Sequence, residues 1–66
     1  MNLKELLLIC TMDQKVSIHL GSLKSDFYLR GTKEEILKTG STIDFLSSKE
    51  VKEIKAENDV LEVSLL

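Results

Sequence analysis

The chain has 66 residues, 30% of them charged, and a formal net charge of −2 with acidic and basic residues interspersed. This length allows one domain, residues 1–66, with a thin stability margin, because so short a chain buries only about 60% of its unfolded surface. The slightly acidic balance argues against a nucleic-acid partner, because nucleic-acid binding is driven by Lys and Arg replacing phosphate counterions.

Cysteine and histidine are too few to build a cross-link or a metal centre. Cys10 is the only cysteine and His19 the only histidine. This excludes an internal disulfide and argues against zinc, whose sites take several such ligands, so we expect no cofactor. The apolar run Leu6–Cys10 is shorter than the core of a signal peptide, and no run approaches the ~18 apolar residues of a membrane span. We therefore expect an intracellular protein without a membrane partner.

The N-terminal segment predicts an amphipathic helix. Asn2 can cap this helix, and Glu5 can complete a capping box. Leu8 and Ile9 widen the apolar stripe, so we expect the helix to be covered on more than one side and to end near residues 11–13. The stripe itself follows helical spacing and consists of Leu3, Leu6, Leu7 and Cys10.

Residues 15–20 and 26–30 alternate between apolar and polar side chains, which predicts two half-buried strands. Residues 21–25 have the composition of a turn, so the two strands form a hairpin. Tyr28 and Arg30 are expected on the outer face. The residues expected to face the core are Val16, Ile18, Leu20, Phe27 and Leu29.

A second, short helix is predicted after the hairpin. Thr32 and Glu35 have the spacing of a capping box, and Gly40 can end the helix in a left-handed conformation. Residues 41–48 fit either a turn of helix or a bent strand. The apolar residues expected to be buried in this region are Ile36, Leu37, Ile43, Phe45 and Leu46.

The last part of the chain predicts a second hairpin. Residues 51–56 and 61–65 alternate around a turn at Asn58-Asp59, and the final strand supplies core residues. The order is an N-terminal helix, a β-hairpin, a short helix and a C-terminal β-hairpin. This order predicts an α+β domain with a small four-stranded antiparallel sheet and helix on one face. Whether the final strand is central or an edge stays open, but an edge strand of this composition would invite another chain to pair.

Four residues of the first hairpin form a candidate binding patch: Lys15, His19, Tyr28 and Arg30. The patch would offer an aromatic ring for stacking, two cations for an anion and an imidazole donor, which suits a nucleotide or an acidic peptide. The alternative is the ordinary solvated face of a hairpin, where such mixtures are common.

Catalysis is not expected. Cys10 could act as a nucleophile with His19 as its base, but Cys10 has only Leu and Ile beside it, and no third group orients the pair. A core cysteine is the better interpretation. The acidic residues lack the spacing of a calcium loop. So short a chain also lacks the walls of a substrate pocket of a few hundred cubic ångströms.

The layout resembles that of short uncharacterised proteins from phages and mobile elements of Gram-positive bacteria. The resemblance rests on an opening like Met1–Leu7, a strand hairpin, a Gly31-Thr32 helix start, and an ending with apolar residues at Val51, Ile54, Leu61, Val63 and Leu65. It implies a protein encoded by a phage or prophage, in the cytoplasm of a bacterial host, where such proteins often inhibit or sequester host factors.

Two functional hypotheses follow. The first is a non-enzymatic protein-binding module that inhibits a host defence or regulatory protein, through a sheet edge or through the patch around His19. The alternative is a sponge for a nucleotide-like small molecule, bound at a homo-oligomer interface by Lys15, Tyr28 and Arg30. Self-association is expected in its own right, because the core is small and the final strand is apolar.

Overall fold

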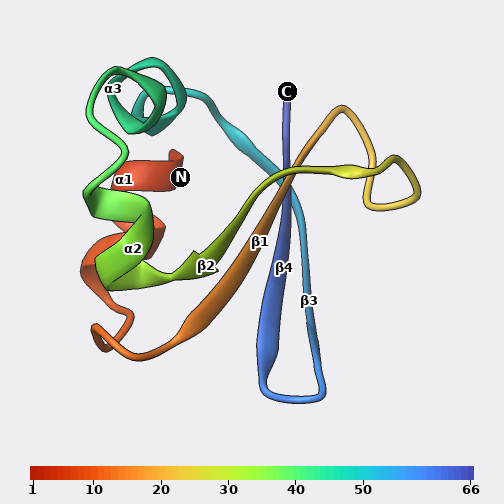
Figure 1. Ribbon diagram of the computed structural model, residues 1–66. Helices are drawn as coiled ribbons and strands as arrows, with labels where there is room; N and C mark the ends of the chain where they lie inside the picture. The colour runs from red at the N-terminus through yellow and green to blue at the C-terminus, as the bar shows by residue number, and fades with distance from the viewer.

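The computed structural model describes residues 1–66 and has an α+β architecture, as predicted. Figure 1 shows the three helices gathered on one side of a strongly twisted sheet. The elements in chain order are α1 (Leu3–Leu8), β1 (Lys15–Leu20), β2 (Phe27–Thr32), α2 (Lys33–Leu37), α3 (Ser41–Ser47), β3 (Val51–Glu57) and β4 (Val60–Leu65).

The sheet is mixed, and the prediction of a purely antiparallel sheet is wrong. The strand order is β2-β1-β4-β3, with antiparallel pairs at both edges and a parallel β1–β4 pair in the centre. Both hairpins form as predicted, but the helices between them let β4 enter beside β1 rather than at an edge. The final strand is therefore central, and Val63, Ser64 and Leu65 are all buried.

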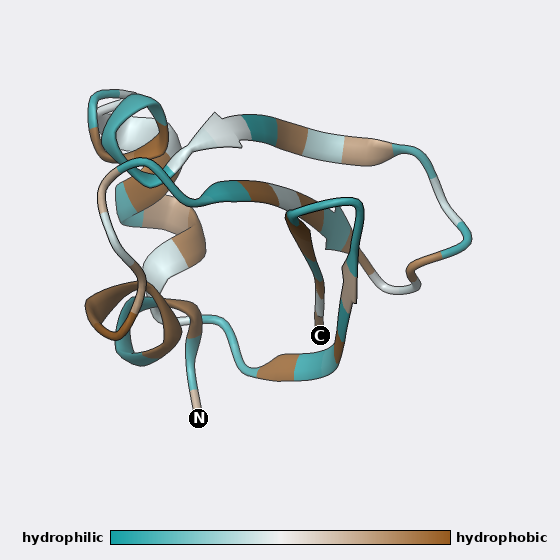
Figure 2. Cartoon of the chain, turned by 90° about the horizontal axis from the view of Figure 1, so that it is seen from below, coloured by the Kyte–Doolittle hydropathy of each residue, from teal (hydrophilic) through white to brown (hydrophobic).

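The core lies between the helices and the central strands and contains only aliphatic residues. Ile18 faces Val63 across the parallel pair, and Leu20 faces Leu65. Figure 2 shows hydrophobic residues on the helices and along the strands that they face, with α1 the most continuously hydrophobic helix. The ten buried core residues are Leu3, Leu6, Leu7, Val16, Ile18, Ile36, Ile43, Leu46, Val63 and Leu65.

Both predicted capping boxes are present. The Asn2 side chain accepts from the Glu5 amide at the start of α1, and the Thr32 hydroxyl accepts from the Glu35 amide at the start of α2. The turn at Asn58-Asp59 is also confirmed. Both residues have positive φ, 52° and 64°, which is the geometry of a two-residue hairpin whose twist matches that of its strands.

Residues 41–48 form a helix, α3, over most of their length, preceded by Gly40 with φ +60°. Ile43 and Leu46 are buried at a spacing of one helical turn, whereas Phe45 between them is 57% exposed. The expectation that Phe45 is buried is therefore wrong, because a helix of this length presents one face to the core.

Three other expectations of burial also fail. The helix α1 ends at Leu8 rather than near residues 11–13, and Leu8 and Ile9 are 71% and 75% exposed. They turn away from the face that carries Leu3, Leu6 and Leu7, and no other element covers them. On α2 only Ile36 is buried, and Leu37 is exposed for the same geometric reason.

A β-bulge reverses the expected orientation of Phe27. Ile18 pairs with Leu29, but His19 pairs with Phe27, so Tyr28 is the extra residue of the bulge. Leu29 packs against the core as predicted, whereas Phe27 lies opposite His19 on the face without helices. A bulge inserts one residue and shifts the alternation beyond it, and this overturns the prediction that Phe27 faces the core.

Candidate binding surfaces

The face of the sheet that the helices leave uncovered carries the polar residues singled out from the sequence. Its side chains form two rows that cross all four strands in the order β2-β1-β4-β3. One row contains Arg30, Ser17, Glu62 and Lys55, and the other contains Phe27, His19, Ser64 and Glu53. Ser17, His19 and Ser64 on the central strands are buried, whereas Glu62 on β4 is partly exposed.

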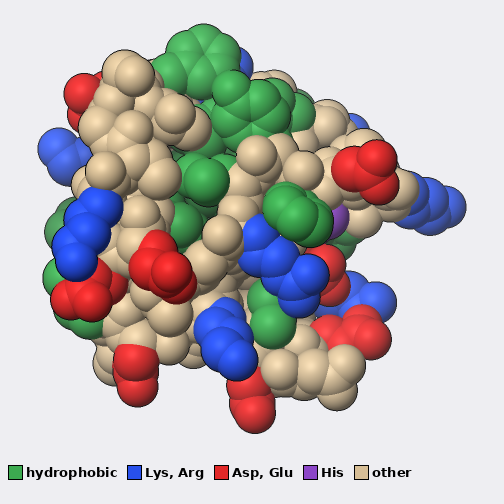
Figure 3. All heavy atoms as spheres, viewed as in Figure 1, with side chains coloured by type: hydrophobic (Ala, Val, Ile, Leu, Met, Phe, Trp, Pro, Cys, Tyr) green, Lys and Arg blue, Asp and Glu red, His purple; other side chains and the backbone are tan.

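His19 is buried at the centre of this face, with only 5% of its surface exposed. Its Nδ1 atom lies 2.8 Å from the carbonyl oxygen of Ser25, which can only accept, so Nδ1 carries a proton and donates. Nε2 lies 3.4 Å from Ser17 Oγ and 3.3 Å from Glu62 Oε1. Both ring nitrogens therefore have partners within the protein. In Figure 3 only a small part of the histidine is visible, beside hydrophobic and charged side chains.

The other candidate residues are exposed but lie in different settings. Lys15 and Arg30 are diagonal neighbours on the uncovered face, since Lys15 pairs with Thr32 and Arg30 pairs with Ser17. The Arg30 guanidinium stacks over the Phe27 ring at 5.6 Å, a cation–π contact. Tyr28 lies at the bulge and is 52% exposed. The residue opposite His19 is thus Phe27, not Tyr28 or Arg30 as the alternation indicates.

Two acidic residues that the sequence does not assign to the candidate patch, Glu53 and Glu62, also lie on the uncovered face. Glu53 accepts a hydrogen bond from the buried Ser64 hydroxyl at 3.1 Å, and Glu62 faces His19. Nothing in the local sequence of the first hairpin indicates these carboxylates. They come from the second hairpin, and only the parallel pairing of β1 with β4 places them here.

Two groups have shifted pKa values, and both are at the surface. A hydrogen bond from Lys55 Nζ to the Glu57 carboxylate, 2.9 Å long, raises the pKa of Lys55. The backbone amide of Thr32 donates to the Glu35 carboxylate at 2.9 Å and lowers the pKa of Glu35. Each shift belongs to a local structural contact, a strand surface in one case and a helix cap in the other.

Cys10 is only partly buried, and its thiol lies 3.5 Å from the Leu6 carbonyl oxygen. The contacts of His19 are all to Ser17, Ser25 and Glu62, so the structure does not bring the two residues together as nucleophile and base. No three residues among the His, Cys, Asp and Glu side chains lie close enough to hold a metal ion.

The two edges of the sheet differ in composition. The edge strand β3 carries Lys52, Glu53, Lys55 and Glu57, and each of these side chains has a partner within the protein. On β2, Arg30 is the one charged residue, and Phe27 and Tyr28 are each 52% exposed. Charged side chains on an edge discourage pairing with another chain, so β2 is the edge that charge leaves unguarded, although the bulge at Tyr28 interrupts its regular pairing.

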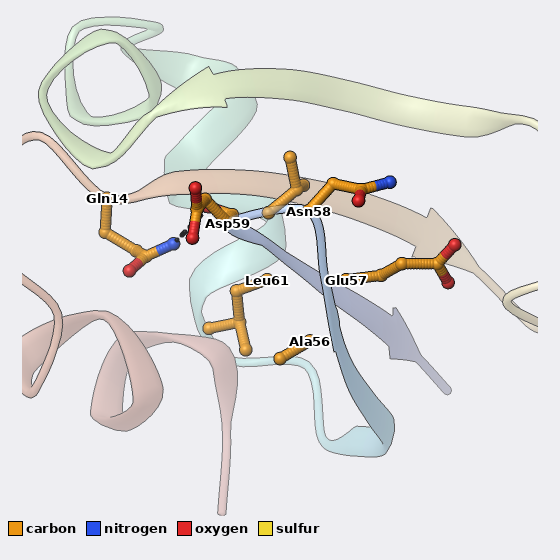
Figure 4. Close-up of a pocket in the computed structure, with 7 residues that line it drawn as sticks. Gln14, Ala56, Glu57, Asn58, Asp59 and Leu61 are labelled. Atoms are coloured by element: carbon orange, nitrogen blue, oxygen red, sulfur yellow. Dashed lines mark hydrogen bonds between the residues drawn. The ribbon is translucent and has the colours of Figure 1, made fainter.

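A shallow hollow of about 320 Å³ lies at the β3–β4 turn. Figure 4 shows the amide of Gln14 reaching toward Asp59, with Ala56 and Leu61 on the same side of the hairpin. Gln14 Nε2 donates to the Asp59 carbonyl oxygen at 3.0 Å, so this amide fastens the turn to β1. The polar groups of the hollow serve the turn, and no cation lines it to receive an anionic ligand.

No helix is both long and apolar enough to cross a bilayer, the longest having seven residues. Comparison of the chain with family models, with curated proteins and with solved structures finds no match in any of the three. Functional conclusions for this chain therefore rest on its own residues.

Proposed function

We propose that the protein is a non-enzymatic protein-binding module that adds an extended segment of a partner protein to the β2 edge of its sheet. One observation carries the proposal. All three aromatic residues of the chain are about half exposed, while the core is built from aliphatic residues alone. Aromatic side chains normally dominate cores, and exposed aromatics with arginine are the residues that concentrate at protein interfaces.

Two of the three aromatics lie on the unguarded edge. Phe27, Tyr28 and Arg30 all lie on β2, and the edge offers backbone N–H and C=O groups to an incoming strand. Main-chain hydrogen bonds would supply affinity, and the aromatic side chains would contact alternate residues of the partner. The Arg30 guanidinium, held over Phe27, is placed to receive a carboxylate, so an acidic residue is expected in the partner segment.

The proposal includes no catalytic step, and the hydrogen bonds of the buried polar side chains support this. Both nitrogens of His19 are engaged, and no buried polar side-chain atom is without a partner. An acid–base catalyst needs a group that can reach its substrate. The resemblance to small phage proteins extends the proposal to a role, namely occupation of a host defence or regulatory protein.

A photo-crosslinking experiment tests the proposal. Benzoylphenylalanine replaces Tyr28 on β2 or, as the matched control, Ile54 on β3, which is similarly exposed at 49%. The expected result is a discrete adduct to one partner from position 28 and none from position 54, with the crosslink mapped to an extended acidic segment. With the purified partner, Tyr28→Glu should weaken binding by about tenfold or more, a loss of ~1.4 kcal/mol, because it removes an aromatic contact and sets a negative charge against the acidic segment, and Ile54→Glu should not.

Equal adducts from both positions, or undiminished binding of the Tyr28→Glu variant, would refute docking at β2. Light scattering over a dilution series shows whether a second copy occupies the edge instead. A dimer that Tyr28→Glu dissociates would make this chain its own β2 partner, in line with the expected homo-oligomer.

The alternative, a sponge for a nucleotide-like molecule, is favoured by one observation: Lys15 and Arg30 are exposed diagonal neighbours on the same face. Against it, Glu62 and Glu53 lie on that face and would repel phosphate groups. Thermal unfolding with added nucleotides separates the two proposals, because a ligand that binds the native state raises the melting temperature. Arg30→Ala should abolish such a shift if the sponge is correct.

A further inference from the structure

The three helices enclose an apolar groove on the side of the molecule that faces away from the sheet's uncovered face. Its volume is about 270 Å³. Leu7 and Ile43 are buried at its base, and Leu8, Met12 and Leu37 are exposed around it. The sequence predicts that Leu8 and Leu37 are covered, whereas both are exposed in the structure. The remaining lining residues are Lys4, Lys33 and Ser47.

Both charged residues that line the groove are cationic. Lys4 and Lys33 are the only charged residues that line it, although the whole chain has a net charge of −2. Lys33 Nζ donates to the Cys10 carbonyl oxygen at 2.9 Å, which fixes one cation beside the apolar surface. An occupant must therefore combine apolar side chains with negative charge at their margin.

We infer that this groove is a second docking site and that it takes an acidic amphipathic helix of a partner protein. Grooves between helices bind the apolar face of such helices through anchors at i, i+3, i+4 and i+7. The flexible side chain of methionine can adapt its shape to different anchors, and Met12 lines this groove. Carboxylates beside the anchors would pair with Lys4 and Lys33.

The charges disfavour one other occupant. A second copy related by a two-fold axis would bring the lysines of both copies to one patch, with no carboxylate in the lining to pair with them. The groove is open to solvent and lined mainly by apolar side chains, which suits side chains that a partner inserts.

This inference is independent of the proposed function, because no residue of β2 lines the groove. If both sites bind one partner, two weak contacts would act together, and linked binding can raise affinity by ~10²–10⁴ without new contacts.

Methionine methyl NMR tests the groove directly, since the chain has two methionines and only Met12 lines it. The probes are two synthetic helical peptides of about 18 residues, long enough to hold helical structure, with identical leucine anchors. One carries glutamates beside the anchors and the other carries lysines. The expected result is a saturable shift of the Met12 methyl resonance with the acidic peptide only, while Met1 stays unchanged.

Two matched variants sharpen the result. Leu8→Ala removes a groove side chain, and Ile9→Ala removes an equally exposed neighbour that does not line the groove. Leu8→Ala should weaken acidic-peptide binding, and Ile9→Ala should leave it unchanged. Lys4→Glu should weaken it about fivefold, since reversing an exposed charge changes a pair interaction by up to about 1 kcal/mol.

Three outcomes would overturn the inference: equal binding of both peptides, an unchanged Met12 resonance, or an equal loss in the Leu8 and Ile9 variants. A Met12 shift that depends on protein concentration without peptide would assign the groove to a second copy. Tyrosine fluorescence reports Tyr28 alone, because the chain has one tyrosine and no tryptophan. The two docking sites can thus fail separately.

Discussion

The two edge strands of this sheet differ in the side chains that they carry and in whether those side chains have partners within the protein. On β3, the charged side chains are held by partners in the loop, on β4 and on the strand itself. On β2, the rings of Phe27 and Tyr28 are about half exposed, and the one contact among these side chains is that of the Arg30 guanidinium over the Phe27 ring. A sheet of four strands must have two edges, and this chain protects one of them by charge. The contrast indicates that the exposure of β2 is a property of its sequence and not of edges in general.

The two central strands pair with both edge strands, so the largest loss of stability is expected from a substitution in a central strand. Ile18 on β1 is fully buried and Ile54 on β3 is about half exposed, so the same side chain can be compared in the two positions. Ile18→Ala should lower the free energy of unfolding by about 2–5 kcal/mol, because it leaves a cavity. Ile54→Ala should cost about 0.5 kcal/mol or less. Urea denaturation measures both, and similar losses would contradict the described burial.

The β2 edge is fastened at its beginning by His19. Replacing His19 by Ala removes the donor to the Ser25 carbonyl and the contacts to Ser17 and Glu62. The expected loss of stability is about 1–3 kcal/mol, because buried polar groups are left without partners. Amide hydrogen exchange should quicken across residues 21–26. Lys24→Ala in the same exposed loop is the control, and a loss of similar size there would show that the loop itself, not His19, is responsible.

The end of β2 is fastened by the cap of α2. Thr32→Ala should cost about 1 kcal/mol, because the Glu35 amide loses its acceptor at the first turn of the helix. Unfolding monitored by circular dichroism gives this value. Thr42→Ala in α3, whose hydroxyl makes no described hydrogen bond, should change stability little. If the two variants behave alike, the Thr32 hydroxyl does not stabilise the junction of β2 and α2.

The smallest expected effect is a pH dependence of stability that arises from Glu35 at the junction of β2 and α2. The pKa of Glu35 is lowered in the folded protein by the Thr32 amide, so the ionised form is favoured on folding. Its contribution is complete above the pKa of the unfolded chain and is lost as the pH falls through the depressed value. NMR of the Glu35 side-chain carboxyl carbon should show a titration below the ordinary pKa of a glutamate. Titration of Glu35 at the ordinary value would rule out an effect of the cap on its pKa.

The local elements follow from the sequence because each depends on neighbours along the chain. The caps at Asn2 and Thr32 need one partner three residues away, and the Asn58-Asp59 turn needs residues that tolerate positive φ. The alternation in β1 and β4 likewise shows which side chains face the core. Each of these predictions is confirmed.

Strand direction and the bulge are not contained in such local patterns. Alternation is the same for a parallel and an antiparallel neighbour, so it cannot place β4 beside β1. The bulge at Tyr28 has no glycine or proline to signal it, and it moves Phe27 from the predicted core to the surface. The placement of Glu62 next to His19 depends on the parallel pairing and could not be read from either hairpin.

The parallel pair at the centre also sets an order of events in folding. Each hairpin can close on its own, because its two strands are neighbours along the chain, but β1 and β4 come from opposite ends and share no local contact. Their pairing must wait until a long loop has closed, and such non-local contacts slow folding. During synthesis the first hairpin and its helices therefore await the last strand before the core is complete. Until then the aromatic β2 edge is accompanied by an open β1 edge, and the nascent chain is at its most exposed to pairing with other chains.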